Sequence, residues 1–289
     1  MIIPCKKIAQ ELEKELKREV LALKKKKKSI KLVVFLVGTS SDQLSFVKIK
    51  KAIASRIGVK FEFINLKETP PFEKFVRLIK ETSHDPETTG IIIQQPLPAQ
   101  LSTDSVYDFI DIKKEIEGHR RKTEFFSPLG LAVLTVFRYL YISPRIDKNL
   151  FVDMKKDING LKKSLKHKKI VIIGRGETGG KPVGKVLTNA KINFVSTNTQ
   201  TINPTEYYKE ADIILTAVGK KVVTADMLKN GVVLINMGLR HEGRKLKGDY
   251  DEKDIKDVAG FYTETPGGVG PLDVLYLYKN LIDAAKMQT

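Results

Sequence analysis

Apolar positions in the first half of the chain fall into short strand-like runs that alternate with helical periods. Residues 31–38 form an apolar run that ends in a glycine, which is typical of a buried strand. Residues 42–57 repeat apolar positions with a helical period, and Gly58 ends the predicted helix. Strands separated by helices indicate a βαβαβ unit with a parallel sheet. The other elements expected here are helices over 5–23 and 71–82 and strands over 59–66 and 90–98.

The second half of the chain repeats this alternation. Residues 168–174 form another buried strand, and a helix begins near Gly180. The two halves join through residues 125–165, which contain the helical run VLTVFRYLYI and then the loop-like stretch IDKNLFVDMKKDING. The pattern as a whole predicts an α/β protein with two lobes. Further strands are expected over 192–197, 211–219 and 231–238, a strand with a Gly/Pro loop over 259–271, and a last helix over 272–287.

Composition narrows the class of protein. The chain has 289 residues and 42% hydrophobic content, enough for a buried core, which excludes wholesale disorder. Its one cysteine, Cys5, excludes a disulfide framework and a cysteine-rich zinc site, and with four histidines we expect no metal site. The N-terminus lacks the apolar run of a signal peptide, and no apolar stretch is long enough to span a bilayer. We therefore expect a cytoplasmic enzyme or binding protein with no membrane partner.

The net charge of +17 raises the alternative of a nucleic-acid-binding protein. Lysine greatly outnumbers arginine, whereas specific readers of DNA favour the arginine fork. The lysines are spread along the whole chain, and no aromatic-rich stacking surface accompanies them. The run 24–28 ends a predicted helix, where cations complement the helix dipole. No nucleic acid is expected as a partner.

A glycine motif follows the strand over 168–174. Gly174, Gly176 and Gly179 spell G-x-G-x-x-G, and Gly180 follows at the start of the predicted helix. In this setting the first glycine permits a tight turn, the second lets the backbone approach a pyrophosphate, and the helix N-terminus supplies N–H groups. The motif therefore predicts a dinucleotide site. A glycine-rich turn without a ligand is the alternative.

The next strand bears on the choice between NAD and NADP. An NAD enzyme commonly places an acid there to hold the ribose 2′-hydroxyl. This strand ends instead in Ser196 and Thr197 with no acid nearby, and Arg175 stands in the glycine motif. Hydroxyls and a guanidinium tolerate or bind a 2′-phosphate, so NADP is favoured. Arg175 could equally be a solvent-facing residue of the turn.

Four further segments carry side chains suited to chemistry. Phe46 and Lys50 share one face of the predicted helix, which suits a flat heterocycle and its proton transfers. Gln94 follows a predicted strand, at the carboxyl end where α/β sheets place ligand sites. The four segments are 46–50 (FVKIK), 94–98 (QQPLP), 114–119 (KEIEGH) and 266–271 (PGGVGP).

With these segments, the chain resembles the bifunctional methylenetetrahydrofolate dehydrogenase/methenyltetrahydrofolate cyclohydrolase family from about residue 30 to 285. PGGVGP is the most specific piece, followed by the strand with Gln94 and Pro-Leu-Pro. The family's Tyr-Val-x-x-Lys falls on Phe46 to Lys50 and its Lys-Asp-x-Asp-Gly on Lys114 to Gly118. Its Gly-Arg-Ser-x-x-Val-Gly-x-Pro falls on Gly174 to Pro182, and its Ala-Val-Gly on Ala217, Val218 and Gly219.

The resemblance implies a pair of reactions in one-carbon metabolism and purine biosynthesis. NADP oxidises 5,10-methylenetetrahydrofolate to the methenyl form, and water hydrolyses that form to 10-formyltetrahydrofolate. It implies that Lys50, Gln94 and Glu117 are catalytic, with Lys50 transferring protons and Gln94 positioning it. Phe46 would stack on the folate, and Glu117 would accept hydrogen bonds from the pterin. The loop residues Pro266, Gly267 and Gly268 would complete the substrate site.

The resemblance also implies two domains, a cleft between them, and partners. Residues 1–122 plus 266–289 would form a three-layer αβα folate domain, and residues 123–265 a Rossmann-type NAD(P)-binding domain. The family forms homodimers through the cofactor domain. The charge of +17 would help attract NADP and a polyglutamylated folate from a distance.

Several positions depart from the family pattern. Phe46 lacks the family's tyrosine hydroxyl, and Glu117 is one methylene longer than the aspartate. Gly176 and Gly179 replace a serine and a valine, and Asp273 replaces a threonine after PGGVGP. The segment 120–127 is shorter than its family counterpart, which helps to wall the folate site. Two alternatives therefore stay open: an enzyme that keeps one of the two steps, and a non-catalytic nucleotide- or folate-binding protein.

For each of these residues, a purely structural role also stays open as an alternative. Lys50 could be a solvated helix residue, Phe46 a core residue, Gln94 a strand-end cap and Glu117 a surface acid. PGGVGP could be a turn before the last helix, although two prolines and three glycines are costly for a turn alone.

Overall fold

The structure is a computed structural model that describes residues 1–243 and 245–288, and it divides into two compact units. The first unit contains Met1–Leu12 and Leu129–Asp273, and the second contains Glu13–Pro128 and the segment that starts at Val274. The helices α1 (Cys5–Lys25) and α9 (Gly270–Met287) contribute residues to both units. The boundaries expected from the sequence, 1–122 plus 266–289 and 123–265, concern the division of function and remain a prediction.

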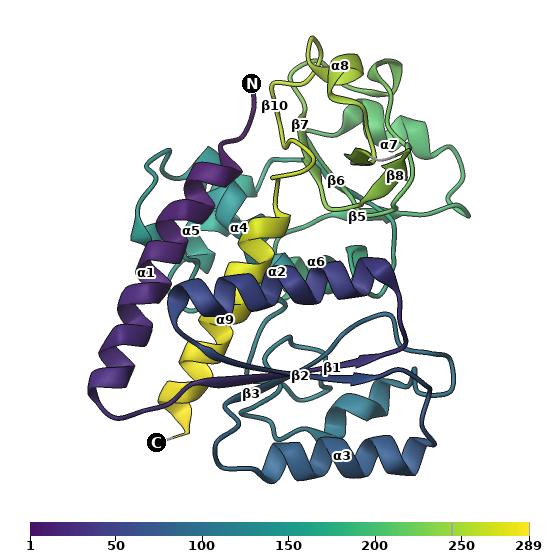
Figure 1. The fold of residues 1–289 in the computed structure, drawn as a ribbon. Coiled ribbons are helices and arrows are strands. Elements are labelled where there is room, and N and C mark those ends of the chain that lie inside the picture. Colours follow the sequence, from purple (N-terminus) through teal and green to yellow (C-terminus); the bar gives the residue numbers. More distant parts are fainter. Residues whose placement is uncertain (244, 289) are drawn as a thin grey trace. The chain divides into compact units, whose positions relative to one another are not determined.

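The second unit is built on a parallel three-stranded sheet with the order β2-β1-β3. Helix α2 covers one face of this sheet and α3 covers the other (Figure 1). This arrangement confirms the βαβαβ unit and the three layers expected from the sequence. The bounds are β1 (Lys31–Val37), α2 (Ser41–Ile57), β2 (Lys60–Leu66), α3 (Phe72–His84) and β3 (Gly90–Ile93).

Local signals place α2 between its neighbouring strands. The Ser40 hydroxyl caps the helix start and accepts a hydrogen bond from the Gln43 N–H at 3.5 Å. Gly58 ends the helix in the left-handed region, with φ +86°, and its N–H donates to the Ala54 carbonyl. The helix that carries Phe46 and Lys50 is therefore fixed at both ends by residues visible in the sequence.

The first unit contains a five-stranded sheet in which every pair of neighbouring strands is parallel. Its order is β10-β7-β6-β4-β5, with β4 and β6 in the interior. The strands that precede the glycine motif and the Ala-Val-Gly loop are thus adjacent, and their carboxyl ends meet at one edge. The bounds are β4 (Ile170–Ile173), β5 (Val195–Thr197), β6 (Ile213–Thr216), β7 (Val233–Asn236) and β10 (Phe261–Tyr262).

Some elements differ from the sequence expectation. The strands are shorter than the apolar runs, because the run ends belong to the turns that follow. A short antiparallel hairpin of β8 (Arg240–Glu242) and β9 (Lys245–Lys247) was not expected, since its residues are mostly charged. Helix α5 (Ile158–Leu165) begins inside the stretch that was expected to be a loop.

The remaining helices lie between these strands or next to them along the chain. The bounds are α4 (Pro128–Tyr141), α6 (Gly180–Asn189), α7 (Pro204–Glu210), α8 (Glu252–Ile255) and the short 3₁₀ helices η1 (Asp104–Phe109), η2 (Lys148–Leu150) and η3 (Ala225–Met227).

No helix among residues 1–243 and 245–288 combines the length and the apolarity needed to cross a membrane.

Candidate active site

Lys50 and Gln94 meet at the carboxyl edge of the three-stranded sheet. The Lys50 Nζ donates to the Gln94 Oε1 at 2.7 Å. Gln94 is 8% exposed and directly follows β3, and its own N–H donates to the Phe35 carbonyl of β1. The amide oxygen is thus held by the sheet and presented to an ammonium group on α2. Lys50 is therefore not a freely solvated helix residue, in contrast to the alternative left open for it.

The backbone of Lys50 is held by a hydrogen bond from α9, whereas the neighbouring Phe46 side chain is exposed. The buried Tyr278 of α9 donates its hydroxyl to the Lys50 carbonyl at 2.6 Å, which fixes the backbone of α2. One helical turn earlier, the Phe46 ring is 41% exposed. An exposed ring one turn from a positioned ammonium argues against a core role for Phe46. It leaves an apolar surface on which a flat heterocycle can stack.

The turn after Gln94 is held by side chains that the sequence did not single out. The Gln95 side-chain amide donates to the Tyr107 hydroxyl, and its Oε1 accepts from the Leu97 N–H at 3.1 Å. The Tyr107 ring stacks on His119 with ring centroids 4.7 Å apart. Gln43 of α2 donates to the Pro96 carbonyl at 2.7 Å. These contacts lock the loop that carries Gln94.

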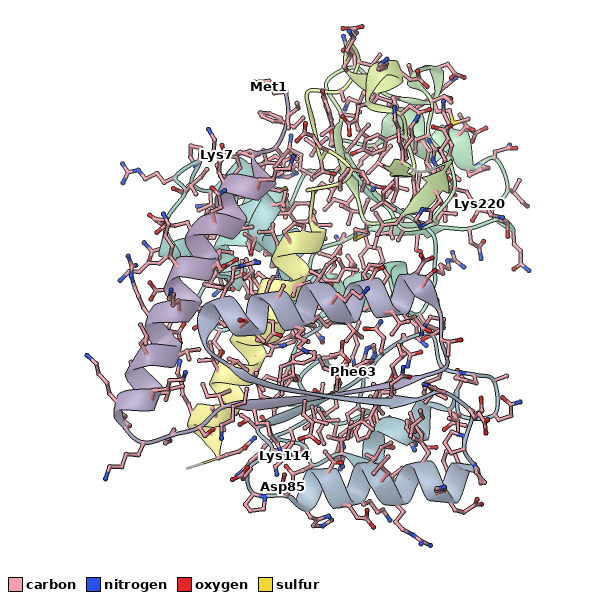
Figure 2. The ribbon with its side chains drawn as sticks, in the orientation of Figure 1. Met1, Lys7, Phe63, Asp85, Lys114 and Lys220 are labelled. Carbon is pink, nitrogen blue, oxygen red and sulfur yellow. The ribbon has the colours of Figure 1, made fainter. Side chains whose placement is uncertain are left out.

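The segment with Glu117 runs beside β3 and reaches the same edge of the sheet. Ile91 and Glu115 form a parallel bridge, so two residues further along Glu117 lies beside the carboxyl end of β3. Lys114 anchors the segment, because its Nζ donates to the Ser83 and Asp85 carbonyls, each at 2.8 Å (Figure 2). Burial lowers the pKa of Lys114. Glu117 is half-buried and belongs to a segment that runs beside the strand preceding Gln94.

Glu115 organises the turn behind Glu117. Its carboxylate is 1% exposed and accepts hydrogen bonds from the Glu117 N–H at 2.9 Å and the Gly118 N–H at 3.1 Å. It also accepts from the Arg120 N–H at 3.3 Å and the Thr123 hydroxyl at 3.4 Å. A buried carboxylate needs such donors to offset its desolvation. The sequence treated this residue only as part of a motif.

The shortened segment 120–127 is held by a side chain of α9. The Asn280 side-chain amide of α9 donates to the Ile116 carbonyl at 2.8 Å and to the Phe126 carbonyl at 3.0 Å. Ile116 lies shortly before the segment and Phe126 near its end, so one side chain bridges the two sides of its base. The short segment is therefore tied to α9 by hydrogen bonds, and the effect of its length on the folate site stays a prediction.

The PGGVGP loop belongs to the first unit and packs against the start of α1. Gly267 has φ +106°, and a Cβ there would lie 2.2 Å from the Lys6 Cε. At Gly268 a Cβ would lie 2.8 Å from the Glu264 carbonyl oxygen. Gly267 is therefore required by its positive φ, since the Lys6 side chain could move aside, whereas at Gly268 the backbone of Glu264 leaves no room for a side chain. The loop leads directly into α9, and Asp273 lies in the first turn of that helix.

The glycine motif forms a tight turn between β4 and α6. Gly174 has φ +102°, and its N–H donates to the Thr197 carbonyl at 2.9 Å. A Cβ on Gly180 would lie 1.8 Å from the Gly174 carbonyl oxygen. Gly176, in contrast, has nothing within 4 Å of a Cβ position. The turn is thus closely packed against the protein at its two ends and open in the middle.

Arg175 and Ser196 meet beside this turn. The guanidinium donates to the Ser196 carbonyl at 2.5 Å and to its hydroxyl at 3.3 Å. Thr197 differs, because its side chain is fully buried and its hydroxyl contacts Tyr208 at 3.1 Å. The whole of Thr197, backbone included, is buried, so the polar surface beside the end of β5 comes from Arg175 and Ser196.

The loop of Ala217, Val218 and Gly219 follows β6 and lies against the glycine motif. The Ala217 carbonyl oxygen would be 2.6 Å from a Cβ on Gly174, and the Ala217 Cβ 2.8 Å from one on Gly179. The two loops are therefore in close contact at the carboxyl ends of adjacent strands. This edge of the sheet is where α/β folds bind nucleotides.

The family models match most of the chain. The model described as the tetrahydrofolate dehydrogenase/cyclohydrolase catalytic domain matches residues 3–117. The model of the NAD(P)-binding domain of the same enzymes matches residues 154–289.

Individual relatives agree with these matches. The chain is 34% identical to the bifunctional protein FolD of Staphylococcus carnosus over 291 residues, with 99% of this chain and 97% of that protein covered. The crystal structure of the bifunctional enzyme FolD from Campylobacter jejuni is similar to it with a TM-score of 0.86 at 26% identity, covering 100% of this chain and 99% of that one. The Trypanosoma brucei enzyme, at 22% identity and a TM-score of 0.83, shares the fold over 99% of this chain and 97% of its own.

Proposed function

The chain belongs to the tetrahydrofolate dehydrogenase/cyclohydrolase family, and from this premise we propose that it catalyses both steps named by that family. In the first step 5,10-methylenetetrahydrofolate loses a hydride to NADP and becomes the methenyl form. In the second step water adds to the methenyl carbon, one carbon–nitrogen bond breaks, and 10-formyltetrahydrofolate is released with a proton. The observation that supports this best is the contact of Lys50 Nζ with Gln94 Oε1 beside the exposed Phe46 ring.

Lys50 and Gln94 are the groups that we assign to the proton transfers of hydrolysis. In its neutral form Lys50 can accept a proton from the attacking water, and the ammonium can return a proton to the leaving nitrogen. Gln94 accepts a hydrogen bond from Nζ and thereby keeps it at one position through both transfers. Phe46 would stack on the folate, and Glu117 would accept hydrogen bonds from the amino edge of the pterin.

The cofactor site that we assign is the edge of the five-stranded sheet. NADP, when bound, supplies the hydride acceptor. The residues present fit it: the open turn at Gly176 leaves room for a pyrophosphate, and the N-terminus of α6 faces the same turn. Arg175 and Ser196 together offer a guanidinium and a hydroxyl to a 2′-phosphate. The cofactor-binding residues that we propose are Gly174, Arg175, Gly176, Gly179, Gly180, Ser196, Ala217, Val218 and Gly219. Thr197, which the sequence also suggested, is fully buried and supports the turn through its carbonyl instead.

The finer assignments of partner and compartment are also proposals. We propose a homodimer formed along β5, because it is an edge strand whose outer side pairs with no other strand in the described part of the chain, and Val195 on it is 43% exposed. We propose that the folate is polyglutamylated and that the enzyme is cytoplasmic. The Pro266–Gly268 loop would contact the substrate, with 1–122 plus 266–289 as the folate-binding part and 123–265 as the cofactor-binding part.

Two assays on one preparation test the function. Formation of NADPH from methylenetetrahydrofolate follows the dehydrogenase, and loss of methenyltetrahydrofolate absorbance follows the hydrolysis. NADP should support a much higher kcat/KM than NAD. A preparation that yields no NADPH and no hydrolysis at high enzyme concentration refutes the assignment, and one that retains a single step favours the monofunctional alternative.

The Lys50→Met variant tests the assigned proton transfers. It should lower the rate of methenyl hydrolysis by at least ~100-fold, the usual contribution of a positioned acid or base. Lys51→Met is the matched control, since Lys51 is the next residue of α2 and is exposed. Equal hydrolysis rates in the two variants would remove Lys50 from the mechanism.

A further inference from the structure

A buried carboxylate lies directly behind the Ala217–Gly219 loop. Asp249 is fully buried, and its Oδ2 accepts a hydrogen bond from the Val218 N–H while its Oδ1 accepts one from the Gly219 N–H, both at 2.8 Å. Its own carbonyl accepts from the Val222 N–H at 2.8 Å. One residue thus holds successive peptide groups of the loop that follows β6. Asp249 lies outside the glycine motif and outside the four segments that the sequence analysis singled out.

These hydrogen bonds determine which way the loop faces. In a trans peptide the N–H and C=O groups point in opposite directions, so an N–H of Val218 directed at Asp249 sends the Ala217 carbonyl the other way. That carbonyl is the atom that lies against Gly174. The loop is therefore held between the Asp249 carboxylate on one side and the glycine motif on the other. Directly after it the chain reaches the surface at Lys220 (Figure 2).

A second buried side chain fixes Asp249. The Asn236 Oδ1 accepts from the Asp249 N–H and from the Thr216 hydroxyl, both at 2.9 Å. Its Nδ2 donates to the Gly238 carbonyl at 2.7 Å and to the Thr265 hydroxyl at 2.9 Å. All the hydrogen-bonding atoms of the Asn236 amide are therefore engaged. Because Thr265 precedes Pro266, the same amide touches the base of the PGGVGP loop.

The surrounding backbone is shaped to admit the carboxylate. A Cβ on Gly238 would lie 2.2 Å from the Asp249 Oδ1, so only glycine leaves the space that the carboxylate occupies. Burial raises the pKa of Asp249, and the N–H groups of Val218 and Gly219 oppose that rise. A buried acid is costly to keep, and here its hydrogen bonds go mainly to the loop.

We propose that Asp249, held by Asn236, is a positioning residue that fixes the Ala217–Gly219 loop in the geometry that binds NADP. The proposal rests on the assignment of this loop to the cofactor site. Loss of the carboxylate frees two N–H groups, lets the peptide groups rotate and displaces the Ala217 carbonyl from the glycine motif. Cofactor binding then weakens, while hydrolysis at Lys50, which needs no hydride acceptor, does not depend on the loop.

The experiment compares Asp249→Asn with the parent enzyme. The asparagine keeps the shape but replaces one acceptor oxygen by an NH₂ group, which faces a backbone N–H. We expect the Kd of NADPH, followed by its fluorescence on binding, and the KM for NADP to rise at least ~10-fold, the effect of losing a hydrogen bond to a charged group. Hydrolysis of methenyltetrahydrofolate without cofactor should stay within about two-fold of the parent, since distant sites act independently.

Two further variants complete the test. Asp212→Asn is the matched control, because Asp212 also accepts a backbone N–H, that of Lys169 at 2.8 Å, at the opposite end of β6. It should leave the Kd of NADPH unchanged. Thr216→Val removes one hydroxyl without changing shape, and should raise that Kd by a smaller factor even if Asp249→Asn fails to fold.

The outcomes separate this proposal from the function itself. A folded Asp249→Asn enzyme with the parent's Kd and KM for NADP overturns the proposal, as does a Thr216→Val enzyme with an unchanged Kd if Asp249→Asn does not fold. Equal weakening by Asp212→Asn would also overturn it, because the effect would then be general. A parent enzyme that binds no NADPH contradicts the proposed function instead.

Discussion

At the scale of the residue, the site depends on how each polar group is held. The Lys50 Nζ donates to the Gln94 side chain, and the Tyr278 hydroxyl donates to the Lys50 carbonyl. The Gln94 amide also donates its Nε2 to the Gln95 carbonyl at 3.0 Å, which fixes which of its two ends faces Lys50. A group that transfers protons needs such fixed placement, because its efficiency falls steeply with distance.

Replacing Gln94 by leucine tests this placement. Gln94→Leu keeps the size of the side chain and removes the acceptor for Nζ, so kcat for methenyl hydrolysis should fall roughly 10- to 100-fold, the value of a hydrogen bond to a charged group. Steady-state hydrolysis assays measure the effect. Tm should change little, because the Lys50 ammonium is partly exposed and can donate to water in place of Gln94. A normal kcat would show that Gln94 does not position Lys50.

At the scale of the element, the glycine motif joins β4 to α6 through a turn that is closely packed where α6 begins. A Cβ on Gly180 would lie 1.8 Å from the Gly174 carbonyl oxygen and 3.3 Å from the Ile172 side chain. The glycines were visible in the sequence, but the sequence alone does not tell that Gly176 and Gly180 have different roles. The structure separates the two: Gly180 is needed for packing, whereas Gly176 faces open space.

The pair Gly180→Ala and Gly176→Ala should separate stability from binding. Gly180→Ala should lower the free energy of unfolding by ~3 kcal/mol, the usual cost of overpacking, because α6 must move away from β4. Gly176→Ala should leave that free energy nearly unchanged and weaken NADPH binding, since its methyl group would stand where the pyrophosphate approaches. Urea unfolding and NADPH titration measure the two effects. Equal stability losses in both variants would contradict this division.

At the scale of the whole molecule, ion pairs contribute to stability. Among the ion pairs of the first unit, Asp251 lies 2.7 Å from the Lys221 Nζ and 2.6 Å from an Arg240 guanidinium nitrogen. The hydrogen bond from Lys221, followed by contributions from Lys247 and Arg240, lowers the pKa of Asp251 from 3.8 to about 2. Some of the lysines behind the net charge of +17 are thus engaged in ion pairs.

The lowered pKa of Asp251 gives a stability effect with a defined sign. Because its folded pKa lies below the unfolded one, the ion pairs stabilise the fold above pH 3.8, and this contribution is lost as the pH falls from there to about 2. Asp251→Asn should therefore lower the free energy of unfolding by about 1 kcal/mol near neutral pH, in the range for partly exposed pairs, and by close to nothing near pH 2. Urea unfolding at the two pH values measures it, and an equal difference at both would refute the electrostatic origin.

The sequence by itself determined the order of the elements and the kind of site. Apolar runs separated by helical periods fixed two parallel sheets, because each period dictates which face of an element is buried. Gly58 and the glycine after β4 marked ends of elements, and Gln94 was placed correctly at the carboxyl end of a strand. Residues 217–219, in contrast, were expected to be part of a strand and form a loop. These features are local, so a window of a few residues contains the information.

The tertiary structure alone decided what holds these parts in place. Asp249 meets Gly219 across 30 residues, and Asn280 meets Ile116 across 164 residues, so no local period records either contact. The exposure of Phe46 and the burial of the Thr197 side chain were equally undetermined, since both depend on which neighbours cover them. Hydrogen bonds between residues far apart in the chain produce no periodic sequence pattern, because any acid or amide at the right point in space can satisfy the same donor.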